Sequence, residues 1–144
     1  MTTLKVTETF ALSPQAAWDR ASDLHRFEQW LTIHDGWRSE LPDTVEQGLR
    51  MTSVISVRGM RNRVDWTLEE YRPIERIGLR GEGKSGTKVA MTLTIAPAGD
   101  GSAITMDVDF SNPMARGPIG SAIGRSLKGD IKRSMAKLAA LPPD

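Results

Sequence analysis

The last stretch of the chain constrains its fold more than any other segment. Apolar side chains recur there every three or four positions, at Ile119, Ile123, Leu127, Ile131, Met135 and Leu138. This spacing places one apolar stripe along a helix. Pro118 suits the first turn of such a helix, and Pro142 and Pro143 cannot continue it. The pattern therefore predicts a helix from Pro118 to Leu141, about 36 Å long.

Alternating apolar residues before this helix predict an antiparallel sheet. The expected strands cover residues 4–12 (with one slip in the alternation), 49–57, 64–68, 77–79, 89–95 and 104–110. Glycine-containing turns are expected at residues 59–62, 81–86 and 97–101. Strands joined by short turns are neighbours in an antiparallel meander.

Two short helices are expected after the first strand. Ser13 is a good helix cap and Pro14 a good first helical residue, and Asp23 can cap a second turn. From Thr32 to Pro42 the pattern is irregular. The sequence thus predicts a single α+β domain over residues 1–144, a helix-grip fold whose curved antiparallel sheet wraps around the C-terminal helix.

Composition excludes several classes of function. The 144 residues carry 19 basic and 18 acidic side chains, which leaves no bulk positive field for nucleic acid. There is no cysteine and there are only two histidines, so we expect no disulfide, no metal site and no cofactor. No apolar run is long enough to cross a membrane, and the first residues lack a signal-peptide pattern. We expect a cytoplasmic protein without integral membrane association.

The grip is expected to enclose apolar walls and hence a ligand pocket. Met51, Met91 and Met106 lie on inward strand faces, where methionine fills irregular space adaptably. Gly120 and Gly124 thin the long helix beside its apolar stripe. Two interpretations of these glycines stay open, namely close packing of helix on strand and room for a ligand near the cavity entrance.

The most unusual window of the chain runs from Trp30 to Arg38. Two tryptophans seven positions apart, with His34 between them, could line a cavity mouth. A histidine of near-neutral pKa can shuttle protons, and arginine can hold a carboxylate or enolate. Catalysis, a hydrogen bond to a ligand and a structural role all remain open for His34, whereas His25 is expected on the surface. Asp65 should point outward, unless the strand register slips and buries it as a candidate base.

The sequence has two clusters of basic residues. Arg58, Arg61 and Arg63 surround a turn with one exposed methionine, Met60. The long helix carries Arg125, Lys128, Lys132, Arg133 and Lys137 against Asp130 alone. These charges fit a solvated helix face, and the alternative is docking to an acidic partner or an anionic membrane surface. No aromatic residues are interleaved with them as RNA binding would require.

Several motifs resemble those of a known superfamily. They are Ser13–Trp18, Ala21–Leu24, Trp30–His34 with Trp37–Ser39, Gly59–Met60 with Asn62–Arg63 and Trp66–Thr67, and Gly117–Gly120. With these residues the chain resembles the START-like (SRPBCC) helix-grip superfamily, the polyketide cyclase/dehydrase-like group, over essentially its whole length. Within it, the chain is similar to a small actinobacterial branch whose members are named as the toxin half of a toxin–antitoxin pair.

The resemblance implies a START/Bet v 1-like fold that binds apolar ligands such as lipids or polyketides between sheet and helix. It supplies no shared catalytic motif. We therefore expect a module that binds a small hydrophobic ligand, with a cognate antitoxin as a further partner. The sequence does not predict an oligomeric state. The expected ligand-binding residues are Trp30, His34, Trp37, Arg38, Met51, Ile55, Trp66, Met91, Leu93, Met106, Gly120, Ile123, Gly124 and Leu127.

Two alternatives remain from the sequence. The first is a cyclase or dehydratase in which His34 or Asp65 lies inside the cavity and Arg38 stands near a developing oxyanion. The second is a protein-interaction module that uses the basic C-terminal helix.

Overall fold

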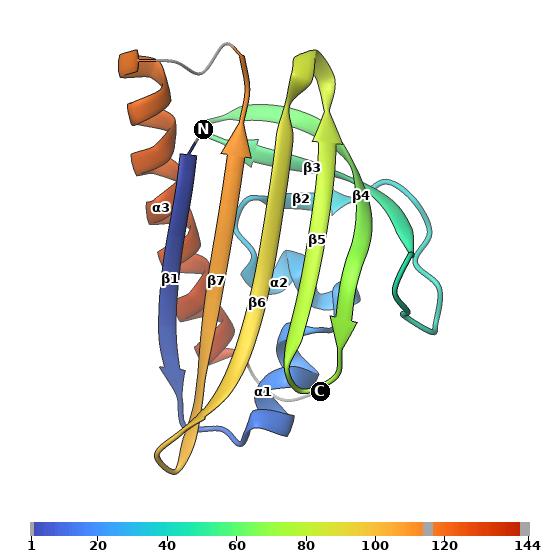
Figure 1. Cartoon of the computed structure of the whole chain (residues 1–144), viewed down its shortest axis with the longest axis vertical. Coiled ribbons are helices and arrows are strands. Elements are labelled where there is room, and N and C mark those ends of the chain that lie inside the picture. The colour runs from blue at the N-terminus through green and yellow to red at the C-terminus, as the bar shows by residue number, and fades with distance from the viewer. Residues whose placement is uncertain (1, 114–116, 142–144) are drawn as a thin grey trace.

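A computed structural model describes residues 2–113 and 117–141. These residues form one seven-stranded antiparallel sheet, curled around a long helix, with short helices after the first strand (Figure 1). The predicted α+β helix-grip architecture is confirmed. The strands are β1 (Thr2–Phe10), β2 (His34–Trp37), β3 (Arg50–Val57), β4 (Met60–Arg72), β5 (Arg76–Gly83), β6 (Lys88–Ala98) and β7 (Gly101–Ser111). Their order in the sheet is β1-β7-β6-β5-β4-β3-β2.

The short helices follow the capping signals in the sequence. Helix α1 (Pro14–Ala21) begins where the Ser13 hydroxyl accepts a 3.2 Å hydrogen bond from the backbone N–H of Ala16. Asp23 caps the 3-10 turn η1 (Leu24–Arg26) in the same way, through the N–H of His25. Helix α2 (Phe27–Trp30) follows directly.

The β3–β4 hairpin turns one position earlier than predicted. Its two loop residues are Arg58 and Gly59, with φ of 54° and 77°, and β4 already begins at Met60. Two consecutive residues with positive φ are what a tight type I′ hairpin turn requires. The predicted turn at residues 59–62 was therefore wrong, because alternation alone does not locate a two-residue loop.

Strand β5 is longer than predicted and runs on to Gly83, where the 3-10 turn η2 (Lys84–Gly86) begins. The reason lies at Gly81, which pairs with Trp66 of β4. A Cβ at Gly81 would lie 2.7 Å from Cε3 of Trp66, so only glycine leaves space for the indole ring on this face. In the sequence the glycines of this segment resemble a loop, but one of them is a packing device within a strand.

The long helix α3 (Gly117–Ala140) packs its apolar stripe against the concave face of the sheet. The stripe residues that are buried are Ile123, Leu127, Ile131, Met135 and Leu138. Ile119, in the first turn, is 62% exposed. The predicted helix is thus confirmed over the described residues, whereas Pro142 and Pro143 lie outside them.

A short strand, β2, closes the sheet at the edge opposite β1. The sequence predicted irregular structure here, because four residues that include Gly36 are too few for a clear alternation. The preceding loop is held on α3 by Thr32, whose backbone N–H donates to Oγ of Ser134 at 2.8 Å. Ser134 in turn donates to the carbonyl of Asp130, one turn earlier in α3. These bonds fix α2 and β2 against the helix.

Candidate functional site

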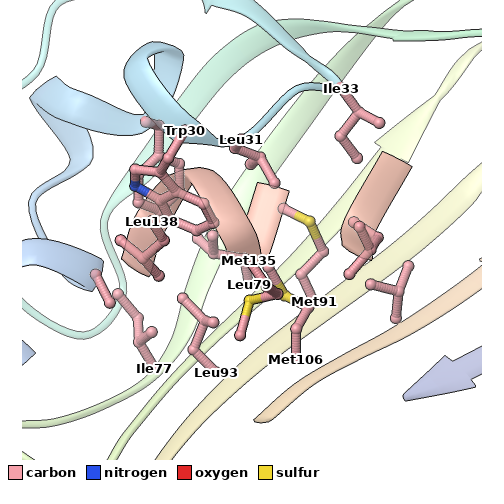
Figure 2. Close-up of a cluster of buried hydrophobic side chains, with 14 of the residues drawn as sticks. Trp30, Leu31, Ile33, Ile77, Leu79, Met91, Leu93, Met106, Met135 and Leu138 are labelled. Carbon is pink, nitrogen blue, oxygen red and sulfur yellow. The ribbon is translucent and has the colours of Figure 1, made fainter. Parts of the chain in front are cut away.

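The space between sheet and helix is filled by side chains. Figure 2 shows residues of α2, β5, β6, β7 and α3 converging on one cluster, in which Met91, Met106 and Met135 meet. The cavity left among them measures about 10 Å³. It is lined by Phe27, Trp30, Leu31, Ile77, Leu79, Met91, Leu93 and Met106. A volume of that size holds at most about one water molecule, so any larger ligand requires these side chains to rearrange.

The composition of this cluster makes such a rearrangement inexpensive. Met91 and Met106 line the small cavity, and Met135 packs beside them with none of its surface exposed. An unbranched thioether chain has several rotamers of similar energy and adapts to irregular space. Of the residues that the sequence proposed for ligand binding, the structure brings Trp30, Met91, Leu93 and Met106 together here, whereas Met51, Ile55 and Leu127 are buried elsewhere in the same core.

A cleft of about 330 Å³ opens at one end of the sheet. Its lining comes from the start of β4, the η2 turn, the end of β7 and the start of α3, as Met60, Arg61, Asn62, Lys84, Ser85, Phe110, Asn112, Ile119 and Ile123. Met60 is 51% exposed, and with the exposed Ile119 it forms an apolar rim. The next residues on the same inner faces are Met106, four positions before Phe110, and Leu127, four positions after Ile123. Residues four apart share a face on both a strand and a helix. We call this the end cleft.

Polar contacts hold the rim of the end cleft in place. The amide Nδ2 of Asn112 donates to Oγ1 of the buried Thr87 at 2.6 Å, which ties the end of β7 to the chain after η2. On the opposite side Arg61 forms an ion pair with Asp35 of β2 at 2.7 Å. From the loop predicted at residues 81–86, Lys84 and Ser85 line the end cleft.

His34 lies inside the fold but not in the end cleft. Its side chain is 8% exposed and packs with Phe27 and Trp37, at ring-centre distances of 6.1 and 4.7 Å. Burial lowers the pKa of His34 below 6.5, opposed by nearby Glu28 and Asp35 and assisted by Arg38. Burial therefore favours the neutral form of this histidine over the charged form. Within the described residues, its Nε2 and the Nε1 of Trp30 are buried polar atoms without a hydrogen-bond partner.

The remaining residues of the Trp30–Arg38 window have separate positions. Trp37 donates from Nε1 to the carbonyl of Leu24 at 2.7 Å, which anchors β2 to the η1 turn. Arg38 is exposed, and its backbone N–H bonds Thr52 of β3. The window meets the end cleft through Asp35 and its ion pair with Arg61. Its predicted role as a cavity mouth stays a prediction.

Asp65 and Trp66 point to opposite sides of β4. Asp65 is exposed and accepts a 2.9 Å hydrogen bond from Oγ1 of Thr52 on the outer face. Trp66 is buried, and its Nε1 donates to Oγ of Ser53 at 2.8 Å. The register does not slip, so Asp65 and His34 do not share a site. Asp65 is therefore not the buried base that the cyclase alternative allowed, whereas His34 is buried and Arg38 is exposed.

Gly120 and Gly124 do not face the interior. Both line a second groove, of about 860 Å³, on the outside of the molecule between α3 and β1. A Cβ at Gly124 would lie 3.2 Å from Cγ2 of Thr2 in β1. At Gly124 the packing interpretation therefore holds, since the glycine lets helix and strand approach.

Of the nine residues that line the end cleft, the sequence proposed only Ile123 as a ligand contact and missed the other eight, Met60 and Phe110 among them. Met60 was the only one with a signal, since a methionine between arginines at a turn is an apolar side chain that the chain leaves exposed. The others come together only when β7, η2 and α3 meet, which no local pattern reports.

Comparison with known proteins places the chain in a family. The family described as polyketide cyclase / dehydrase and lipid transport matches residues 1–141. The chain belongs to this family. Its fold is that of the START-like superfamily: a START superfamily protein from Mycobacterium smegmatis superposes with a TM-score of 0.71 at 18% identity, over 96% of this chain and 94% of the other.

Two relatives from Mycobacterium tuberculosis are more similar in sequence. An uncharacterized protein, Rv1546, is 39% identical over 141 residues, which are 98% of this chain and 99% of the relative. A protein named Toxin Rv0910 is 43% identical over 124 residues, 86% of each chain. In the part of the chain that the structure describes, no helix is long and apolar enough to cross a membrane.

Proposed function

We propose that this polyketide cyclase/dehydrase-family protein binds a small apolar or amphipathic ligand, of lipid or polyketide type, between its sheet and α3. The observation that carries the proposal is the end cleft, where an apolar rim of Met60 and Ile119 leads over Phe110 and Ile123 to a methionine-rich core. Soluble proteins leave few large apolar side chains exposed together unless they bind something.

The ligand's apolar body would occupy space now filled by Met91 and Met106. Burial contributes about 25 cal/mol per Å² of apolar surface, before the costs of rearrangement and of lost motion. The buried Nε1 of Trp30 is a hydrogen-bond donor, and His34, which like Trp30 packs against Phe27, offers a neutral imidazole. A hydroxyl or carbonyl of the ligand could bond with these groups, which would assign the polar part of the Trp30–Arg38 window a role in binding.

Mass spectrometry tests the proposal directly. The protein is purified under native conditions from cell extract, and its mass is compared before and after denaturation. We expect an extra mass that denaturation removes, together with uptake of a fluorescent fatty acid by the ligand-free protein. Absence of both, with an intact fold, would identify the interior as a permanently filled core.

A pair of surface variants tests the route into the protein. Ile119→Lys places a charge on the exposed rim and should weaken fatty-acid uptake roughly tenfold through lost apolar contact. Ile74→Lys is the matched control, because Ile74 is also an exposed isoleucine, at 40%, but lies in the turn between β4 and β5. Equal uptake by the two variants would exclude the end cleft as the entrance.

The relative named a toxin supports a second part of the proposal, that this chain acts as the toxin of a toxin–antitoxin pair. Controlled expression in a bacterial host should then slow growth, and co-expression of the neighbouring gene should restore it. If ligand capture is the means of inhibition, Ile119→Lys relieves the growth defect and Ile74→Lys does not. Unchanged growth on expression of the wild-type chain would remove the toxin assignment and leave ligand binding standing.

A further inference from the structure

The groove between β1 and the first half of α3 carries an inference beyond the proposed function, because it lies outside the interior and the end cleft. Its lining residues are Thr2, Thr3, Leu4, Lys5, Gly117, Gly120, Ser121, Gly124, Arg125 and Lys128. None of them is acidic, and three are cationic: Arg125 and Lys128 come from α3, whereas Lys5 pairs with Asp107 of β7 at 3.7 Å. At about 860 Å³ it is larger than the end cleft.

One wall of the groove is an edge strand. Strand β1 ends the sheet and pairs only with β7, with which it is in continuous register from Thr2 to Phe10. In an antiparallel strand every second residue directs its N–H and C=O away from its neighbour. Within residues 2–113 and 117–141, no other strand pairs with this edge. Such an edge is a template for one more strand.

The other wall is α3, which runs beside β1 (Figure 1). Helix and strand are close at Gly124, where an added Cβ would lie 3.2 Å from Cγ2 of Thr2. Arg125 and Lys128 are exposed on the same part of the helix. Neither of these two cations has an ion-pair partner among the described residues. Arg133, further along the helix, pairs with Asp130 instead.

From these three features we infer that the groove binds an extended acidic segment of a protein partner, which adds a strand to β1. The backbone of the segment would bond the free edge of β1, and its carboxylates would meet Arg125 and Lys128 of α3. Strand addition supplies affinity through main-chain bonds and specificity through alternate side chains. A nucleic acid or an anionic membrane would match the charge but would make no use of the strand edge.

The test uses the full chain and a fluorescent peptide that alternates valine and glutamate. The groove variant is Arg125→Glu with Lys128→Glu, and the matched control is Lys132→Glu with Lys137→Glu, which reverses two exposed charges of the same helix outside the groove. We expect the groove variant to bind roughly tenfold more weakly, since it replaces two attractive charge pairs with two repulsive ones. The control should bind like the wild type.

Strand addition has a second readout that does not depend on charge. The peptide should slow hydrogen exchange at alternate amides of β1, and the same peptide with alternate backbone nitrogens methylated should not bind. No peptide binding at millimolar concentration, or equal binding by both double variants, would overturn the inference. Binding of anionic vesicles or RNA that the groove variant loses, with β1 amides unprotected, would assign the groove to a different partner and also overturn it.

Discussion

His34 illustrates how the fold sets the chemistry of one residue. A histidine in the open is a proton carrier near neutral pH, but this one lies among Phe27 and Trp37, where burial disfavours the imidazolium and lowers its pKa. Because burial disfavours the charged imidazole, protonation of His34 should lower the stability of the folded protein.

The stability of the protein should therefore fall in mild acid. Because the folded-state pKa of His34 lies below 6.5, the unfolded chain binds more protons as the pH drops through 6.5. The contribution of His34 to the free energy of unfolding is complete above that pH and decreases below it, down to the folded-state pKa. Urea denaturation from pH 7.5 to pH 5, about the range in which histidine titrates, measures this slope.

His34→Phe should flatten that slope, since phenylalanine fits an aromatic cluster and does not titrate. His25→Gln changes the other histidine, which is exposed, and serves as the control. If His34→Phe kept the wild-type slope, the acid sensitivity would arise from another group.

Residue patterns in the sequence located some side chains well and others not. Alternation placed Asp65 on the outside and Trp66 on the inside of β4, because one buried face fixes strand register. The same reasoning could not find the close contact of Trp66 with Gly81, which belongs to a neighbouring strand. A local sequence pattern predicts which face of an element a residue lies on, but not which residues of other elements it contacts.

Among the elements, α3 was the easiest to predict and β2 the hardest. Six apolar residues at regular spacing define one face of α3, whereas β2 has four residues and depends on β3 and on α3 for its position. Neither pattern predicts the end cleft or the groove between α3 and β1, because each is formed by segments that are distant in sequence.

The glycines of α3 give a prediction for the helix as a unit. A Cβ at Gly129 would meet only the flexible Nη1 of Arg133, at 3.4 Å. Gly129→Ala should therefore raise the free energy of unfolding by about 1 kcal/mol, the usual preference of a helix for alanine. Gly124→Ala should gain less, because its methyl group would press on Thr2 at 3.2 Å. Urea denaturation compares the two, and an equal gain would mean that α3 and β1 are not closely packed there.

For the molecule as a whole, core packing and ligand capacity should change in opposite directions. Met106 is 1% exposed and lines the small central cavity, so Met106→Ala should lower the free energy of unfolding by about 2 to 5 kcal/mol. The same change enlarges the space that a ligand needs. A fatty acid should therefore raise the Tm of this variant by more than it raises that of the wild type.

Ile104→Ala is the matched control for that prediction. Ile104 is as fully buried and lies on the same strand, but it does not line the central cavity. Thermal melts with and without fatty acid separate the two effects. A larger ligand-dependent shift for Ile104→Ala than for Met106→Ala would place the binding space elsewhere in the core.

The position of Thr2 has a practical consequence for every binding measurement on this protein. Strand β1 begins at Thr2, in the wall of the groove beside α3, so any peptide joined in front of it emerges at that groove. An affinity tag placed there sits at high effective concentration beside Arg125 and Lys128, and an acidic tag would compete with a partner on the same molecule. Assays of partner binding therefore call for removal of such a tag, and a gain in binding on its removal would itself report that the groove is a docking site.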